Sequence, residues 1–128
     1  MVTGFPQFNT DTQRQTVDLI AATPNSPLLT TMSMIAPSPD WFTGLSGFDM
    51  RNLKTNTWYQ SISIETFPYD AGTDVGATYA AADVPAPQPV PIFRLTADTL
   101  PPKALLNAAG TAVLPVARWQ CNLVTSNP

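Results

Sequence analysis

The 128-residue sequence contains no histidine and a single cysteine, and only 12% of its residues are charged. Without histidine, the chain lacks the usual base of serine and cysteine hydrolases and the most common protein ligand of zinc. Its six basic residues form no run, which argues against nucleic acid as a partner. No apolar run approaches the length of a membrane span, so the sequence predicts no transmembrane segment.

The lone cysteine, Cys121, has no second cysteine in the chain with which to form a disulfide. It lies in a run of alternating apolar residues, so we expect a small buried side chain without redox function. The N-terminal residues 1–15 have neither a basic start nor an apolar stretch, so no signal peptide is visible.

Proline is abundant, with 14 residues, roughly twice ordinary usage. Proline interrupts helix interiors and central strands, so we expect short strands and little helix. Prolines 85, 87, 89 and 91 make residues 84–91 an extended strap, over the domain or over a partner. Residues 1–27 are mixed and polar and form a partly irregular N-terminal extension. A short helix is expected there, with Thr10 or Asp11 as its cap and Val17, Ile20 and Ala21 on one face.

Alternating apolar and polar residues predict the remaining elements as strands, at residues 26–39, 41–48, 57–66, 92–96 and 116–124. In the first half of this set, Gly44 and Gly47 indicate a bulge or a close approach of two backbones. Trp58, Ile62 and Ile64 should share one face of their strand, and the last strand should direct four side chains inward: Ala117, Trp119, Cys121 and Leu123. We expect Trp58 and Trp119 to lie in the core. Within the loop before the last strand, we expect a helical turn at residues 103–106. Residues 28–126 are therefore predicted to form one all-β domain, an antiparallel β-sandwich.

Two stretches combine acidic residues with glycine and proline. In D-A-G-T-D, residues 70–74, Gly72 permits a bend that brings Asp70 and Asp74 together, and such a pair repels unless a cation lies between. Oxygen ligands in a flexible loop suit calcium, and Asp40 is the best third carboxylate. The alternative is that Asp40 and Asp70 are turn residues whose side chains bond the backbone. Other acids, Glu65, Asp49 and Asp83, are expected to be solvated or in turns.

The motif Ser38-Pro39-Asp40-Trp41, followed by Gly44, Trp58 and the loop at residues 68–79, resembles the spondin domain of the F-spondin and mindin family. The resemblance implies a β-sandwich similar to C2 domains. It also implies a calcium ion held by Asp40, by the Trp41 carbonyl, and by Asp70 and Asp74. The family's domain is longer at the N-terminus, so strands that complete one sheet are expected to be absent here or supplied by a partner.

We therefore expect a non-enzymatic, calcium-braced protein-recognition or adhesion module, secreted or extracellular by family resemblance. The alternative is a structural accessory subunit, docked in a larger assembly that could be luminal or associated with a membrane complex. A third reading, lipid or carbohydrate binding, rests on the C2 analogy alone, and the lack of basic loops counts against acidic membranes. Under each reading the protein partner itself is not identified by the sequence.

Overall fold

The computed structural model of the protein describes residues 7–9, 14–16, 20–99 and 105–124. The regular secondary structure of this part is almost entirely antiparallel β-strand, which confirms the all-β prediction; its helical residues are the 3₁₀ turn Ala97–Thr99 and Leu105. The strands in chain order are β1 (Gln7–Asn9), β2 (Arg14–Thr16), β3 (Leu28–Met34), β4 (Trp41–Asp49), β5 (Arg51–Asn52), β6 (Thr57–Trp58), β7 (Ser61–Thr66), β8 (Pro68–Asp70), β9 (Phe93–Arg94) and β10 (Ala117–Asn122).

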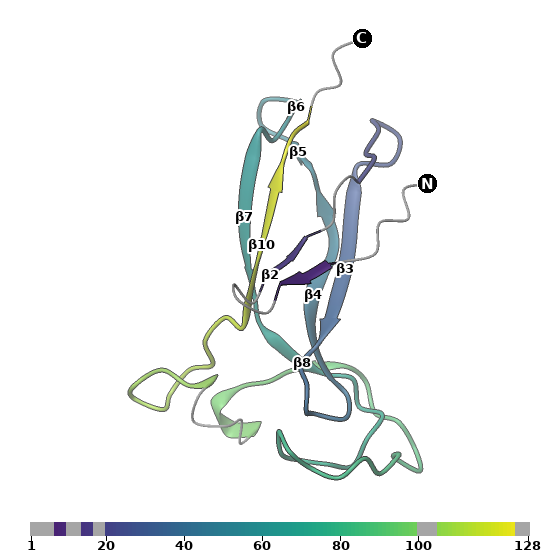
Figure 1. Ribbon diagram of the computed structural model, residues 1–128, viewed down its shortest axis with the longest axis vertical. Helices are drawn as coiled ribbons and strands as arrows, with labels where there is room; N and C mark the ends of the chain where they lie inside the picture. Colours follow the sequence, from purple (N-terminus) through teal and green to yellow (C-terminus); the bar gives the residue numbers. More distant parts are fainter. Residues whose placement is uncertain (1–6, 10–13, 17–19, 100–104, 125–128) are drawn as a thin grey trace.

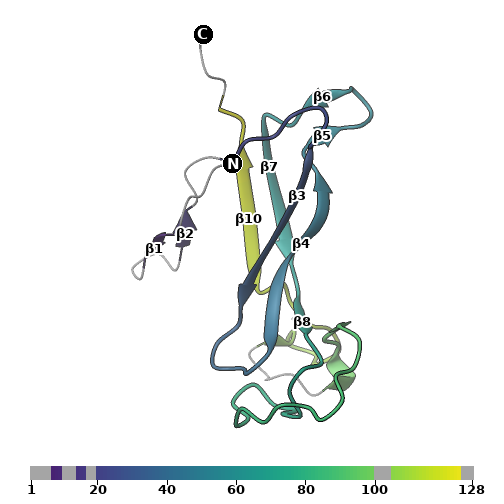
Figure 2. The same cartoon turned by 90° about the vertical axis from the view of Figure 1, so that its right-hand side faces the viewer.

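Two antiparallel layers run along the long axis of the molecule (Figure 1). One layer is a four-stranded sheet in the order β3-β4-β8-β9, and the other is the pair β10-β7. The β5–β6 hairpin lies at one end of these layers, and long loops that follow β8 gather at the opposite end (Figures 1 and 2). The pair β1–β2 joins neither layer, and Figure 2 shows it well apart from β3.

Little of this molecule is buried. Among the described residues, the large apolar side chains in the fully buried core are Leu29, Trp41 and Leu95. Trp58 and Trp119, which the sequence placed in the core, are only partly buried. The two layers therefore leave apolar surface open that a compact sandwich would cover.

The prediction of a short N-terminal helix is wrong. Residues 14–16 form β2, which pairs with β1 in a register that sets Phe8 opposite Gln15. Thr10, Asp11 and Val17 lie outside the described residues, while Ile20 and Ala21 are exposed. A short helix needs a packed apolar face to be stable, and the exposed Ile20 and Ala21 provide none. Residues 103 and 104 of the expected helical turn also lie outside the described part; of the other two, Leu105 is in 3₁₀ conformation and Leu106 forms a β-bridge with Val113.

The long strand expected at residues 57–66 is divided in two. Its first part, β6, pairs with β5, and its second part, β7, pairs with β10. Between them, Tyr59 donates its backbone N–H to the Met50 carbonyl at 3.1 Å, which extends the β5–β6 pairing by one residue before β7 begins. Within β7 the predicted alternation holds, since Ile62 and Ile64 are more buried than their neighbours.

The last strand also matches its prediction in part. In β10, Ala117, Trp119 and Cys121 lie on the more buried face, as expected. Leu123 was expected to join them, but it follows the end of the strand and is 38% exposed. The alternation stops there because the ladder with β7 ends at Asn122.

The two glycines of β4 serve the two purposes that the sequence indicated. Along the β3–β4 ladder, the step from Leu29 to Thr31 is matched on β4 by the step from Phe48 back to Leu45, so β4 carries one extra residue. Gly47 lies in this bulge with φ of 61°. Gly44 has ordinary φ, but a Cβ there would lie 2.1 Å from the Thr31 carbonyl oxygen. The sheet therefore needs glycine at both positions, for conformation at one and for space at the other.

We predict that Gly44→Ala destabilises the fold far more than Gly47→Ala. The first change forces a methyl group into a backbone atom of β3, and we expect a loss of about 3 kcal/mol or more. The second meets open space and costs about 1 kcal/mol for the left-handed backbone alone. Urea unfolding of both variants measures the difference, and equal losses would contradict this account of the β3–β4 contact.

Candidate functional site

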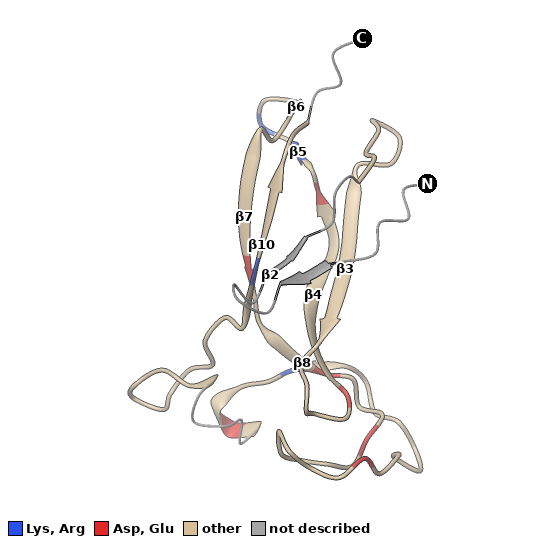
Figure 3. Cartoon of the chain, in the orientation of Figure 1, with Lys and Arg blue, Asp and Glu red and all other residues tan. Residues whose placement is uncertain are grey.

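The two acidic motifs meet because β4 begins where β8 ends. These strands are antiparallel, and their register pairs Trp41 with Asp70. The residue before Trp41 and the residues after Asp70 therefore emerge side by side at the loop end of the molecule. Figure 3 shows acidic residues gathered at this end.

Asp40 is the centre of the contact between the motifs. Its side chain is 6% exposed, and its Oδ2 accepts hydrogen bonds from the Thr73 N–H at 2.9 Å, the Thr73 hydroxyl at 3.1 Å and the Asp74 N–H at 3.0 Å. Its backbone carbonyl accepts a further bond from the Ala71 N–H at 3.3 Å. The second carboxylate oxygen, Oδ1, is buried and has no hydrogen-bond partner.

The carboxylate of Asp70 is turned toward donors of the protein itself. Its Oδ2 accepts the indole N–H of Trp41 at 3.0 Å, and its Oδ1 accepts the Gly72 N–H at 2.7 Å. Asp70 is 9% exposed and Trp41 is 1% exposed, so this bond is shielded from water. A charged acceptor in such a place makes a stronger bond than a neutral one.

Asp74 repeats the same local geometry. Its Oδ1 accepts the N–H of Gly76 at 2.6 Å, and its Oδ2 accepts the N–H of Val84. Asp70 and Asp74 thus each bond the amide two residues ahead, which is the turn chemistry of aspartate that the sequence left open as an alternative. Sequence reasoning placed that role on Asp40 and Asp70; the structure shows it for Asp70 and Asp74, while Asp40 bonds a distant loop.

The donor chemistry of this end suits a hard cation only in part. Within the described residues, no three carboxylate, cysteine or histidine side chains lie close enough together to hold a metal ion. The Trp41 carbonyl, expected as a ligand, accepts the Ile35 N–H at 2.9 Å. The unpartnered Oδ1 of Asp40, however, is a buried anionic oxygen with ligand capacity to spare. Asp40 thus fits a cation, and the other expected ligands are oxygens that each already accept a hydrogen bond.

The proline strap closes over the same loop. The Gly72 carbonyl accepts the Val90 N–H at 2.9 Å, and the Thr73 carbonyl accepts the Ala86 N–H at 2.8 Å. Gly72 has φ of 70°, and a Cβ there would lie 2.3 Å from the Val90 carbonyl oxygen. The strap residues between the prolines therefore use their N–H groups to hold the D-A-G-T-D loop, and only glycine fits beneath them.

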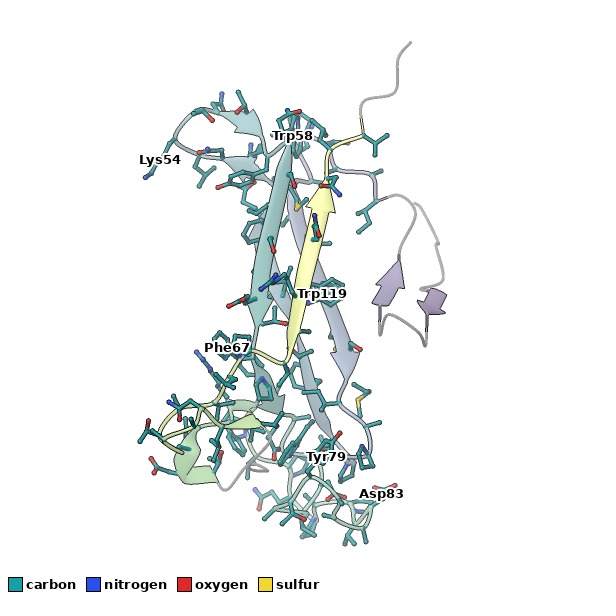
Figure 4. All side chains as sticks on the ribbon, turned by 60° about the vertical axis from the view of Figure 1, so that its left-hand side comes forward. Lys54, Trp58, Phe67, Tyr79, Asp83 and Trp119 are labelled. Carbon is teal, nitrogen blue, oxygen red and sulfur yellow. The ribbon has the colours of Figure 1, made fainter. Side chains whose placement is uncertain are left out.

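Three contributors were not found from the sequence. Ser38 accepts the Trp41 N–H on its Oγ at 2.8 Å, which shapes the turn before β4. Thr73 supplies two of the donors to Asp40, and Tyr79 packs against Trp41 with ring centroids 6.0 Å apart. Tyr79 also donates its hydroxyl to the Ala36 carbonyl, and Figure 4 shows it among the loops at this end. Serine three residues before an amide is a recognised turn pattern, so Ser38 had a readable signal.

The other acids behave as expected. Glu65 is exposed and pairs with Arg118 at 2.9 Å across the β7–β10 ladder. Asp49 pairs with Arg51 at 2.9 Å, and the hydrogen bonds from Arg51 hold the pKa of that carboxyl below its usual value. Asp83 is exposed in the loop after Tyr79.

Comparison with known proteins assigns the family. The Spondin_N family model matches residues 2–106, which include both acidic motifs and the strap. The chain belongs to the Spondin_N family. Spondin-1 of Rattus norvegicus and Spondin-1 of Homo sapiens are each 34% identical to it in an alignment of 110 residues that covers 78% of this chain and 14% of the relative. Spondin-2 of Homo sapiens is 40% identical over 47 residues, 37% of this chain and 14% of the relative.

The chain spans 14% of the length of Spondin-1 of Rattus norvegicus. In the described part of this Spondin_N chain, no helix has the length and apolar character needed to cross a membrane.

We predict that Trp41→Phe destabilises the domain by about 2 to 4 kcal/mol in the presence of a chelator. The change removes the indole N–H from the buried Asp70 carboxylate and also leaves unfilled space. Trp119→Phe is the matched control, because the Trp119 Nε1 is buried without a partner and its loss breaks no hydrogen bond. We expect about 1 kcal/mol or less for Trp119→Phe. A similar loss in both variants, measured by urea unfolding, would show that the Trp41–Asp70 bond does not stabilise the site.

Proposed function

We propose that this Spondin_N chain is a non-enzymatic protein-recognition module, secreted or extracellular, whose loop end is braced by a calcium ion. The observation that carries the calcium proposal is the buried, unpartnered Oδ1 of Asp40. A buried carboxylate oxygen without a donor carries a desolvation penalty, which a bound cation would offset. The proposed ligands are Asp40, the Trp41 carbonyl, Asp70 and Asp74.

The residues of the proposed calcium site would have different roles. Thr73 and the Asp74 N–H hold Asp40 Oδ2 in place. These hydrogen bonds fix the orientation of the carboxylate and therefore the position of its Oδ1. Calcium supplies positive charge that lets several carboxylates share one small volume, and its variable coordination suits irregular loops. Asp70 and Asp74 each keep lone pairs beyond the single amide bond that each oxygen accepts. The metal would therefore stiffen the loops that present the recognition surface.

The calcium proposal is tested by calorimetric titration of chelator-treated protein together with its melting temperature. We expect saturable binding and a rise in melting temperature with calcium, because a ligand that binds only the folded state stabilises it. Asp40→Asn, Asp70→Asn and Asp74→Asn should each weaken binding by about tenfold or more.

Asp49→Asn is the matched control, since Asp49 is an ion-paired aspartate outside the loop end. It should bind calcium as the natural chain does. If the folded natural chain gives no heat and no shift in melting temperature, the three aspartates act only as turn and loop residues, and the calcium proposal fails.

The second candidate function is a structural accessory subunit docked in a larger, luminal or membrane-associated assembly. The observation that favours it is that few large apolar side chains are buried among the described residues. Exposed apolar side chains lie on several elements of the described part, among them Leu28, Met32, Met34, Val84, Val90 and Ile92. A permanent partner would cover such surface.

The two candidates differ in how the isolated chain behaves. A free recognition module should unfold in one cooperative transition and bind little of a dye that senses exposed apolar surface. A docked subunit should bind the dye strongly and lack a cooperative transition until its partner is added. Purified protein, monitored by near-ultraviolet circular dichroism and dye fluorescence during heating, separates these outcomes.

A further inference from the structure

Strand β3 (Leu28–Met34) is an open edge of the four-stranded sheet. Among the strands that the structure describes, it pairs with β4 alone. The Pro27 carbonyl accepts the Met50 N–H at 3.0 Å, and the Ile35 N–H donates to the Trp41 carbonyl at 2.9 Å, so both flanking residues direct these groups toward the β4 side. Backbone groups alternate in direction along an antiparallel strand, and the bulge adds its residue to β4 and not to β3. The backbone N–H and C=O groups that point away from the sheet therefore belong to the even-numbered residues Leu28, Thr30, Met32 and Met34.

This edge carries none of the features that protect edge strands. Protection normally comes from charged residues, proline or a bulge within the edge itself. Residues 19–39 contain no charged residue, and β3 contains no proline. The side chains of Leu28, Met32 and Met34 are 61%, 69% and 57% exposed. In contrast, the second layer carries the charged pair Glu65 and Arg118 across its strands.

We propose that β3 is a homodimer interface, in which two copies of this chain pair antiparallel through their β3 edges. The proposal goes beyond the calcium-braced recognition function and does not depend on it. An isologous contact of this kind closes on itself and leaves no further edge of the same type to extend.

The sequence of β3 suits self-pairing about Thr31. With Thr31 opposite its own copy, Leu28 faces Met34 of the other copy and Thr30 faces Met32, so apolar side chains meet or flank threonine throughout. In this register the whole of β3 overlaps, and its outward N–H and C=O groups all face one another. No like charges are placed opposite each other, because the strand has none.

Charge also favours the antiparallel arrangement of the two copies. The chain has a net charge of −3, and its acids gather at the loop end, whereas β3 is drawn uncharged along its length in Figure 3. Because β3 runs along the long axis, antiparallel pairing directs the two acidic ends away from each other. A parallel pairing would bring them side by side.

Cysteine cross-linking tests both the interface and its register, in the 128-residue chain with Cys121→Ala to remove its own cysteine. Thr31→Cys places two thiols directly opposite across a non-hydrogen-bonded pair, where the Cα separation of about 4.5 Å suits a disulfide. Ser33→Cys is the matched control on the same face of β3, because Ser33 would face Leu29 and lie about 13 Å from its own copy. Under mild oxidation we expect a covalent dimer, twice the 13.8 kDa of one chain, for Thr31→Cys only.

Sedimentation equilibrium of the natural chain should show a reversible dimer. Met32→Lys should raise its dissociation constant by about tenfold or more, because it sets two like charges near the axis of the paired strands. Leu53→Lys, at an equally exposed position on the β5–β6 turn, should leave the dissociation constant unchanged.

Several results would overturn the proposal. These are a monomer at all concentrations without cross-linking of Thr31→Cys, a dimer that Met32→Lys leaves intact, and cross-linking through residue 33 in place of residue 31. Calcium binding by a monomeric chain would leave the proposed function standing while this interface fails.

Discussion

A single carboxylate oxygen, Oδ2 of Asp40, accepts two backbone N–H groups and one hydroxyl from residues more than thirty positions later in the chain. This contact joins the start of β4 to the loop after β8. It stabilises the junction because the Asp40 side chain is only 6% exposed and one charged acceptor serves three donors of the later loop. The arrangement of the whole loop end follows from where these donors are held.

Two further contacts depend on that junction. With the loop fixed by Asp40, Asp70 lies beside the Trp41 indole, and the resulting buried bond lies among the few fully buried large side chains of the fold. The strap then lies across Gly72 and Thr73, using amides that its prolines leave available. Loop, strand ends and strap thus form one hydrogen-bonded unit, although they contain almost no regular secondary structure.

The sequence predicted the meeting of Asp40 with the D-A-G-T-D loop, but it did not predict how the carboxylates are directed. Proximity follows from strand pairing and from the likeness to spondin domains, both of which are visible in the residues. Direction depends on the positions of individual N–H groups, such as that of Thr73, which no spacing rule supplies. The calcium ligation drawn from the resemblance stays a prediction for the same reason.

The secondary structure was likewise predicted in part. Alternation in β7 and β10 and the two glycines of β4 were readable, because period-two patterns and glycine each have a direct structural cause. The N-terminal helix was wrong, since apolar spacing in a short segment is overridden when the segment pairs as a strand. Burial of the tryptophans was also misjudged: Trp41 beside the acids is the buried one, because its indole N–H has a partner there.

The order of residues along the chain has a consequence for synthesis. Asp40 leaves the ribosome well before Thr73 and Asp74, so its carboxylate waits, solvated and unpaired, until the later loop has been made. The strap arrives later still, and the ladder between β7 and β10 spans about half the sequence. Because these contacts join distant residues, folding is expected to be slow compared with that of helical domains of this size. The nascent chain then exposes the uncharged β3 segment throughout this interval, which makes early chaperone protection valuable.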